Sequence, residues 1–416
     1  MKDSLMLYLH MPFCVKKCHY CDFLSFVCDE EARGAYVGAL CEELRVRGGE
    51  MKGRTVSSVF FGGGTPSLLS PAQISEIMTV ISEIFVLTDD AEITMECNPG
   101  TIHGEAGYKA EEKARVAEDA ICCKAEEKAH AAEEEELAKL AGYRAAGVNR
   151  LSIGLQSMQE EELELLGRIH DREAFLRTYE LARKAGFSNV NVDLMNALPG
   201  QTLETWKDTL ESVLALAPQP EHLSVYSLIL EEGTTFAAWE KQGRFTGRLA
   251  IPSEDADREM YAYTGKRLAQ AGYQQYEISN YSKPGHACRH NLGYWTRKEY
   301  LGLGLGAASL LSEVRYSNET RLENYLGDPL AGRQEEALSR KAKMEEFAFL
   351  GLRTTQGVSR ETFRECFHDE IDQYWHEVIQ RNVADGLLLD DGETIRLTAK
   401  GMDLGNYVSA QFLLDD

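Results

Sequence analysis

The sequence predicts an α/β protein built on a parallel sheet, open or closed into a barrel, followed by a small α+β domain. Three observations lead to this prediction. Short apolar runs alternate with amphipathic stretches over the first two-thirds of the chain, which is typical of βαβ units. From about residue 341 helical stretches precede a hairpin instead. Polar and glycine-rich motifs follow several apolar runs, where active sites of parallel α/β folds lie.

Six apolar runs are predicted strands, and amphipathic stretches between them are predicted helices. The strands are expected at 4–10, 58–62, 92–98, 148–155, 190–195 and 222–229. The helices are expected at 29–47, 71–85, 137–146, 159–167, 171–185 and 202–216. Ser70 before Pro71 is a helix start signal, and Glu204 follows another at Gln201-Thr202.

The rest of the chain divides into two further regions. Residues 231–340 are less regular, and they contain a polar and aromatic segment at 276–295. Residues 341–416 predict three helices, a short hairpin and a last helix, which suggests a winged-helix-like domain. Winged helices often bind DNA. Because residues 340–416 hold nine Lys or Arg against fifteen Asp or Glu, a structural role is favoured for this domain.

Composition excludes several classes of function. The 416-residue chain has a net charge of -23, so it repels phosphate backbones, and no basic patch points to nucleic acid. No run of about 18 apolar residues predicts a membrane span, and the first residues do not form a signal peptide. We therefore expect a cytoplasmic protein without an integral membrane segment, whose ten cysteines are thiols or metal ligands.

Three cysteines form a motif directly after the first predicted strand. Cys14, Cys18 and Cys21 follow a C-x3-C-x2-C spacing, with which a short loop can offer three thiolates to three irons of a 4Fe-4S cluster. The alternative is zinc, but a structural zinc site takes four ligands, and His19 inside the loop is a poor fourth ligand. Three thiolates leave one iron open, and it can chelate the amino and carboxylate groups of S-adenosylmethionine (SAM).

A segment rich in Ala, Glu and Lys lies between two predicted strands. Residues 105–141 contain KAEEKA twice, at 109–114 and 124–129, and oppositely charged pairs four residues apart support a helix. We interpret it as a solvated helical insertion at about 104–136. The adjacent Cys122 and Cys123 could form a redox or metal site, but no third ligand stands at a convincing spacing.

Several motifs together resemble one family. YLHMPFCVKKCHYCDF (8–23) resembles the radical SAM signature, specifically that of oxygen-independent coproporphyrinogen oxidases and HemW-type heme chaperones. The resemblance continues through FFGGGTPSLL (60–69), ECNPGT (96–101), NRLSIGLQS (149–157) and VDLMNALPGQT (192–202) to the end of the chain. It implies a partial TIM-type barrel, taken as 1–230, a family-specific extension at 231–340 and a C-terminal domain at 341–416.

The resemblance also implies a set of SAM-binding residues. Glycines let a backbone approach a ligand closely, an arginine can face a carboxylate, and an aspartate can face ribose hydroxyls. Each such residue alone could equally be a turn, capping or core residue. The residues that match the family's SAM contacts are Tyr8, Tyr20, Gly63, Gly64, Thr65, Glu96, Gln156, Arg168 and Asp193.

Two branches share these motifs. The oxidase branch carries a further cysteine two residues after the third ligand, where this chain has Phe23, and it has a long N-terminal extension. The chaperone branch shows the CDF ending and a His-Asn-x-x-Tyr-Trp motif, present in this chain as 290–295. The chaperone interpretation is favoured. It implies that the protein binds heme as cargo, passes it to respiratory hemoproteins, and has an electron donor as a further partner. The alternative is the oxidase, a decarboxylase of coproporphyrinogen in heme biosynthesis.

His290 is the candidate heme contact, because imidazole is a common axial ligand. Cys288 and His286 are weaker candidates. The alternative for His290 is that it braces a loop near the barrel mouth.

Overall fold

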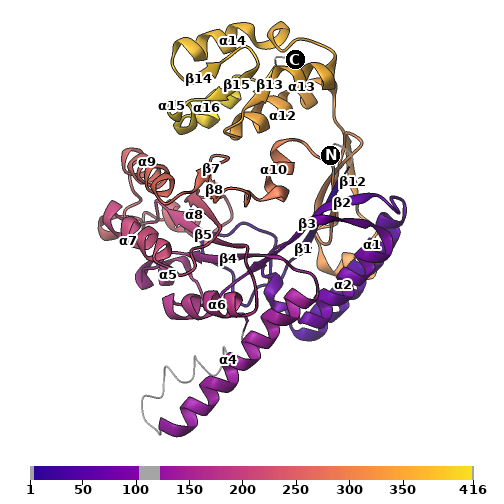
Figure 1. Ribbon diagram of the computed structural model, residues 1–416, viewed down its shortest axis with the longest axis vertical. Coiled ribbons are helices and arrows are strands. Elements are labelled where there is room, and N and C mark those ends of the chain that lie inside the picture. The colour runs from indigo at the N-terminus through magenta and orange to yellow at the C-terminus, as the bar shows by residue number, and fades with distance from the viewer. Residues whose placement is uncertain (1–3, 103–121, 415–416) are drawn as a thin grey trace.

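The barrel is formed by one long, open sheet. The structure, a computed structural model, describes residues 4–102 and 122–414. The strands of the described sheet follow the order β12-β11-β10-β9-β1-β2-β3-β4-β5-β6-β8-β7, and its middle six run parallel (Figure 1). These six are β1 (Leu5–Met11), β2 (Thr55–Gly63), β3 (Val86–Cys97), β4 (Arg150–Gln156), β5 (Val190–Asn196) and β6 (His222–Ser227).

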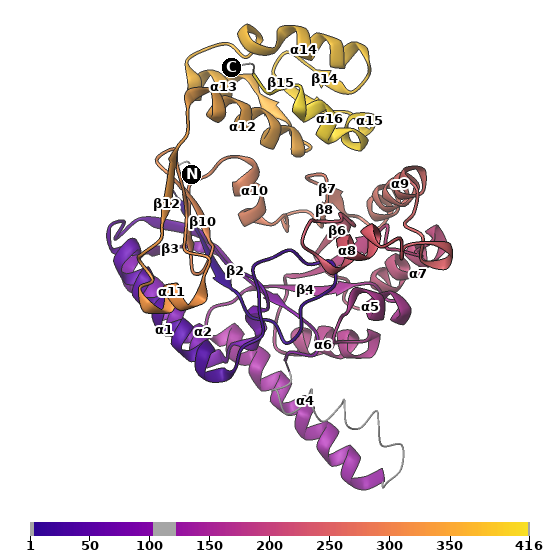
Figure 2. The same cartoon turned by 180° about the vertical axis from the view of Figure 1, so that it is seen from behind.

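Helices between these strands cover the outer face of the sheet (Figure 2). The two predicted start signals act as helix caps, because Ser70 and Thr202 both form capping boxes. The structure adds a third cap, in which the Asp171 carboxylate accepts a hydrogen bond from the amide of Ala174. The helices of the barrel are α1 (Glu30–Gly49), α2 (Pro71–Ile84), α4 (Cys122–Ala145), α5 (Glu160–Leu166), α6 (Arg172–Lys184), α7 (Leu203–Leu214), α8 (Thr235–Lys241) and α9 (Glu254–Gln270).

The two faces of the strands have different chemistry. In β1 the odd-numbered residues from Leu5 to Met11 belong to the main hydrophobic core with the helices. The even-numbered Tyr8 and His10 form hydrogen bonds instead. Several polar side chains of β4, β5 and β6 are likewise buried, including Arg150, Ser152, Asn191 and His222. The barrel interior is therefore lined by polar groups that hydrogen-bond to one another.

The region expected to be irregular extends the sheet at both edges. On one side β9 (Tyr300–Leu303) runs parallel to β1, and β10 (Ala308–Leu311), β11 (Val314–Ser317) and β12 (Gln334–Ala337) follow antiparallel. On the other side β8 (Asn280–Ser282) pairs with β6 and with β7 (Gln274–Gln275). Strands of two to four residues leave too little periodicity to be predicted.

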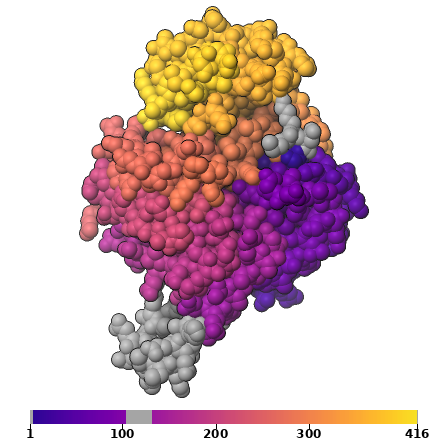
Figure 3. Space-filling model, viewed as in Figure 1, coloured from indigo at the N-terminus to yellow at the C-terminus, as the bar shows by residue number. Residues whose placement is uncertain are grey.

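The C-terminal part has the predicted winged-helix-like order of elements. Its sheet β13-β15-β14 is antiparallel, and a separate hydrophobic core holds Phe363, Trp375 and Phe412. Figure 3 shows it as a lobe at one end of the molecule. The elements are α12 (Arg340–Arg353), β13 (Val358–Ser359), α13 (Arg360–Phe367), α14 (Asp372–Ala384), β14 (Leu388–Asp390), β15 (Thr394–Leu397), α15 (Ala399–Asp403) and α16 (Gly405–Ala410).

This lobe packs near the amino-terminal ends of the parallel strands. The amide of Thr355 donates to the Tyr276 carbonyl at 3.0 Å, and Arg353 forms an ion pair with the buried Glu277 at 3.5 Å. The short helix α10 (Arg289–Trp295) lies between the lobe and the sheet (Figure 1). The carboxyl ends of the strands, at the other end of the barrel, are left for a ligand.

Part of the insertion lies within the described residues. Helix α4 extends away from the barrel (Figure 1), and its later part is joined to the body by Lys184, which pairs with Glu133 at 3.1 Å. The side chains of Cys122 and Cys123 lie outside the described residues, so the hypothesis about them stays open. In the described part of the chain, no helix is long and apolar enough to cross a membrane.

Candidate functional site

A cavity of about 320 Å³ opens at the carboxyl ends of the parallel strands. This size is in the range of small-molecule sites. The three motif cysteines and most of the residues expected to contact SAM line it together. The cavity is lined by Cys14, Lys16, Lys17, Cys18, Tyr20, Cys21, Phe23, Ser25, Gly63, Gly64, Thr65, Glu96, Cys97, Asn98, Ser152, Gly154, Gln156, Arg168, Asp193, Met195 and Tyr226.

The cysteine loop is fixed to the barrel at its base and in its middle. The amide of Cys14 donates to the Phe26 carbonyl at 3.0 Å, and the amide of Phe26 donates to Pro12 at 2.9 Å. His19 is the central anchor, because its amide donates to Leu166 and its ring nitrogen Nδ1 to Leu165, both at 2.9 Å. His19 therefore holds the loop against α5, and its Nδ1 is occupied by a carbonyl.

The three thiols are free and half-buried. The Thr65 hydroxyl donates to Cys14 Sγ at 3.5 Å, and Arg168 donates to Cys18 Sγ at the same distance. Burial, together with the neighbouring Cys18 and Cys14, raises the pKa of Cys21 to about 11. Within the described residues, no group of three or more His, Cys, Asp or Glu side chains converges to hold one metal ion. A 4Fe-4S cubane does not need such a convergence on one ion, because each thiolate binds a different iron of the cluster.

The glycine turn after β2 brings the backbone close to the cysteine loop. Gly63 has a φ of +111°, and a Cβ there would lie 2.5 Å from the His10 ring. A Cβ on Gly64 would lie 2.6 Å from the Phe13 carbonyl oxygen. Both positions therefore require glycine, and they place the Thr65 side chain against Cys14.

Two carboxylates of the cavity wall influence each other electrostatically, Glu96 near the end of β3 and Asp193 in the middle of β5. Burial and the charge of Asp193 raise the pKa of Glu96 to about 8, and burial raises the pKa of Asp193 as well. The Glu96 carboxylate accepts the amide of Gly63 at 3.1 Å. Because two like charges in a cavity disfavour each other, this wall suits a ligand with positive charge and hydroxyl donors.

Arg168 supplies a partly buried positive charge to the cavity, beside the exposed Lys16 and Lys17. It donates to the Gly154 carbonyl at 2.6 Å and to Asn98 Oδ1 at 2.8 Å, while its Nε is buried without a hydrogen-bond partner among the described residues. Gln156 ends β4 with a φ of 73°. Non-glycine residues with such a φ cost about 1–3 kcal/mol and concentrate at functional sites.

Two of the predicted contacts lie away from the cavity lining. The Tyr8 hydroxyl donates to His10 Nδ1 at 3.0 Å, below the cavity, and its ring stacks on Phe60. His290 is 1% exposed. Its Nδ1 is 2.9 Å from the Ser58 hydroxyl, and its Nε2 is 3.0 Å from the Tyr294 hydroxyl.

These contacts favour the alternative in which His290 braces the fold, but at the amino-terminal end of the barrel and not at its mouth. Burial lowers the pKa of His290 to about 3, so the ring is neutral. Cys288 is also buried, and its Sγ is 3.4 Å from Glu92 Oε1. His286 is partly exposed. The heme assignment of His290 stays a prediction.

Several lining residues were missed by the sequence analysis. Asn98 accepts a hydrogen bond from Arg168. Its position in the ECNPGT motif, directly after a predicted strand, could have identified it as a lining residue. Ser152 donates to Asp193 at 3.0 Å from the neighbouring strand, and only the register of β4 and β5 reveals this contact. Tyr226, 40% exposed at the end of β6, had no signal beyond its position.

Comparisons with known proteins agree with this site. Residues 8–213 match the Radical SAM superfamily, and residues 338–404 match the HemN C-terminal domain. The chain is 36% identical to the heme chaperone HemW of Lactococcus lactis, over 98% of this chain and 97% of that protein. It is 32% identical to HemW of Bacillus subtilis, over 98% of each. The chain belongs to the HemW family.

HemW proteins share their fold with the oxidase branch. The structure of coproporphyrinogen III oxidase (HemN) from Escherichia coli, a radical SAM enzyme, has a TM-score of 0.77 to this chain at 26% identity and covers 99% of it. The partial barrel with its C-terminal domain is therefore confirmed. Membership of the HemW family also confirms the branch that the CDF ending and the His-Asn-x-x-Tyr-Trp motif predicted.

Proposed function

We propose that this protein is a heme chaperone that holds a 4Fe-4S cluster on Cys14, Cys18 and Cys21, and that binds SAM beside it. The observation that carries the proposal is the cavity in which three free, half-buried thiols face two carboxylates and a guanidinium. The cluster, when bound, supplies an open iron and an electron. In this proposal the protein is cytoplasmic, heme is its cargo, respiratory hemoproteins receive the heme, and a separate protein donates electrons.

The lining residues fit SAM chemically. Arg168, with one unpartnered buried nitrogen, suits the carboxylate of the methionine part. Glu96 suits its ammonium group, which would neutralise one of two mutually repelling carboxylates. Asp193 can accept hydrogen bonds from ribose hydroxyls. Gly63 and Gly64 let the backbone of the turn approach the ligand, and Tyr20 and Gln156 complete the wall.

The test is anaerobic reconstitution of the full chain followed by hemin titration with and without SAM. We expect about four irons per chain, SAM binding that depends on them, and a saturable hemin absorption change. Replacing the three cysteines together by serine removes iron and SAM binding. The matched control is Cys366→Ser, because Cys366 is an exposed free thiol in the C-terminal lobe. Full iron content in the triple variant contradicts the cluster assignment.

The fold shared with HemN keeps the oxidase as the second candidate. Anaerobic incubation with coproporphyrinogen, SAM and a reductant distinguishes the two. We expect no protoporphyrinogen and an unchanged tetrapyrrole. Formation of protoporphyrinogen would make the protein a decarboxylase.

A further inference from the structure

A continuous chain of hydrogen bonds crosses the barrel interior, from the cavity to the first turn of α10. Asn191 Nδ2 donates to Asp193 Oδ1 at 2.8 Å. Asn191 Oδ1 lies 2.6 Å from His222 Nδ1, and His222 Nε2 lies 2.8 Å from the Tyr276 hydroxyl. The Tyr276 oxygen in turn accepts the amide of Cys288 at 3.4 Å.

The chemistry of the groups fixes the direction of every bond. An ionised Asp193 only accepts, so the amide nitrogen of Asn191 faces it and the amide oxygen faces His222. That oxygen also only accepts, so the proton of His222 lies on Nδ1. Burial and the charge of Arg150 hold the pKa of His222 well below its usual value. Its Nε2 is then an acceptor, to which the Tyr276 hydroxyl donates.

All four hydrogens therefore point from α10 towards Asp193. Bonds aligned in this way polarise one another in a low-dielectric interior. His222 and Asn191 are buried, so within the barrel their chain is shielded from water. This alignment gives a change in the hydrogen bonding of Asp193 a physical route to Tyr276, and the same route runs in reverse.

The far end of the chain is attached to the helix that carries the His-Asn-x-x-Tyr-Trp motif. The Glu92 carboxylate, from β3, accepts the amides of Arg289 at 3.1 Å and His290 at 3.2 Å. Tyr276 and Glu92 thus hold the three amides at the start of α10. Tyr276 is also bound through its carbonyl to Thr355 of the C-terminal lobe, so the chain ends where lobe, helix and barrel meet.

We infer that His222 and Tyr276 are positioning residues that couple the SAM cavity to α10, so that SAM bound in the cavity changes the hydrogen bonding at the start of this helix. The inference rests on the proposed function. Ribose hydroxyls that donate to Asp193 compete for the oxygens on which Asn191 depends, and the His222–Tyr276 pair carries that change to α10.

The test compares Tyr276→Phe with the wild-type protein. The variant keeps the ring and removes only the hydroxyl. Tyr273→Phe is the matched control, because Tyr273 is also buried and its hydroxyl donates to the Pro220 carbonyl, outside the chain of bonds. Amide hydrogen exchange of 288–295 is measured on each reconstituted protein with and without SAM.

We expect SAM to change the exchange of 288–295 in the wild-type protein and in Tyr273→Phe, although these residues do not line the cavity. The change is lost in Tyr276→Phe. The same change in a Tyr276→Phe protein that binds SAM overturns the inference and leaves the proposed function intact. Failure of the wild-type protein to bind SAM at all overturns the proposed function, and this inference with it.

The wild-type protein alone already tests the coupling. Unchanged exchange in this segment, in a protein whose cavity segments respond to SAM, overturns the coupling even if Tyr276→Phe does not fold.

Discussion

Arg168 and Cys18 are in contact although 150 positions separate them in the sequence: Nη1 of the arginine lies 3.5 Å from Sγ of the cysteine. The same guanidinium is bound to Gly154 and Asn98, so its position is set by the ends of β3 and β4. Cys18 is one of the three cysteines proposed to hold the cluster, so this hydrogen bond reaches the proposed metal site. One side chain thus links the loop of cysteines to the ligand-binding wall.

Replacing Arg168 by glutamine is expected to weaken SAM binding. Hydrogen bonds to charged groups contribute about 1.5–3 kcal/mol, which corresponds to a loss of roughly 10- to 150-fold in affinity. Equilibrium dialysis of SAM against the reconstituted variant measures the effect. Arg172→Gln, at an exposed position on the next helix, is the control and is expected to bind as the wild type does. If both variants bind SAM with equal affinity, Arg168 does not contribute to SAM binding.

The raised pKa of Glu96 predicts how the stability of the ligand-free protein depends on pH. The pKa is about 4.5 in the unfolded chain and about 8 in the folded one, so the folded state binds the extra proton. The contribution of protonated Glu96 to the free energy of unfolding is therefore fully present below pH 4.5, and it is lost as the pH rises through about 8. Glu96→Gln removes the loss, because an amide stays neutral and its oxygen can still accept from Gly63.

We expect Glu96→Gln to match the wild type near pH 4.5 and to be more stable above pH 8. The gain is about 1.4 kcal/mol for each unit by which the pKa is raised, so it amounts to a few kcal/mol. Urea unfolding of metal-free protein at several pH values measures it. Glu164→Gln, at an exposed carboxylate, should show no such trend. A difference from the wild type that does not vary with pH would show that the charge of Glu96 is not its cause.

The central barrel could be predicted because its signals are local. Strands and helices of the first 230 residues have clear periodicity, and the capping residues Ser70 and Thr202 act where the sequence placed them. The cysteine motif and the residues after strand ends were predictable for the same reason, because the carboxyl ends of parallel strands meet at one edge.

What the sequence could not provide depends on contacts between distant segments. Strand β9 has four residues, and it is a strand because β1 offers it a partner. His290 was a reasonable ligand candidate by residue type. Only the structure shows that Ser58, 232 positions away, and Tyr294 occupy its ring nitrogens. The sequence did not mark Asn191 and His222 as important either, because only their hydrogen-bond partners in the folded structure show what they connect.

The burial of His290 predicts that its removal costs stability without any heme present. His290→Ala leaves a cavity beside Phe60 and an unpaired Ser58 hydroxyl, for an expected loss of about 2–4 kcal/mol. Urea unfolding of the heme-free protein measures it. His376→Ala, in which the imidazole is 64% exposed, is expected to change stability by less than about 0.5 kcal/mol. A heme-free His290→Ala protein as stable as the wild type would contradict the bracing role.

Ser58→Ala separates bracing from ligation. It removes the hydrogen-bond partner of His290 and keeps the imidazole, so a bracing role predicts weaker hemin binding in both variants. Ligation predicts weaker binding in His290→Ala alone. We expect the loss in both, measured by hemin titration under conditions where each variant is folded.

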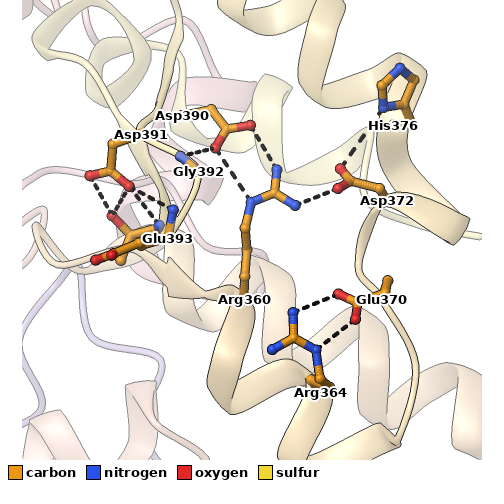
Figure 4. A network of polar contacts seen from close by, with 10 residues as sticks. Arg360, Arg364, Glu370, Asp372, His376, Asp390, Asp391, Gly392 and Glu393 are labelled. Atoms are coloured by element: carbon orange, nitrogen blue, oxygen red, sulfur yellow. Dashed lines mark hydrogen bonds and ion pairs between the residues drawn. The ribbon is translucent and has the colours of Figure 1, made fainter.

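In the C-terminal lobe, one guanidinium joins three elements (Figure 4). Arg360, on α13, donates to Asp390 on β14 at 2.7 Å and to Asp372, the first residue of α14, at 2.6 Å. The side chains of Arg360 and Asp390 are 14% and 16% exposed, so this ion pair is little screened by solvent, whereas Asp372 is 44% exposed. Arg360→Met keeps the chain length but leaves two carboxylates without their cation, for an expected loss of about 1.5–3 kcal/mol.

Arg364, one helical turn further on, provides a matched control for this prediction. It binds Glu370 at 2.6 and 2.9 Å (Figure 4), but both side chains are half exposed. An ion pair in that position contributes at most about 1 kcal/mol. Hydrogen exchange of the lobe in the full chain should therefore speed up much more in Arg360→Met than in Arg364→Met. Equal effects would show that burial does not set the strength of these pairs, since their geometry is similar.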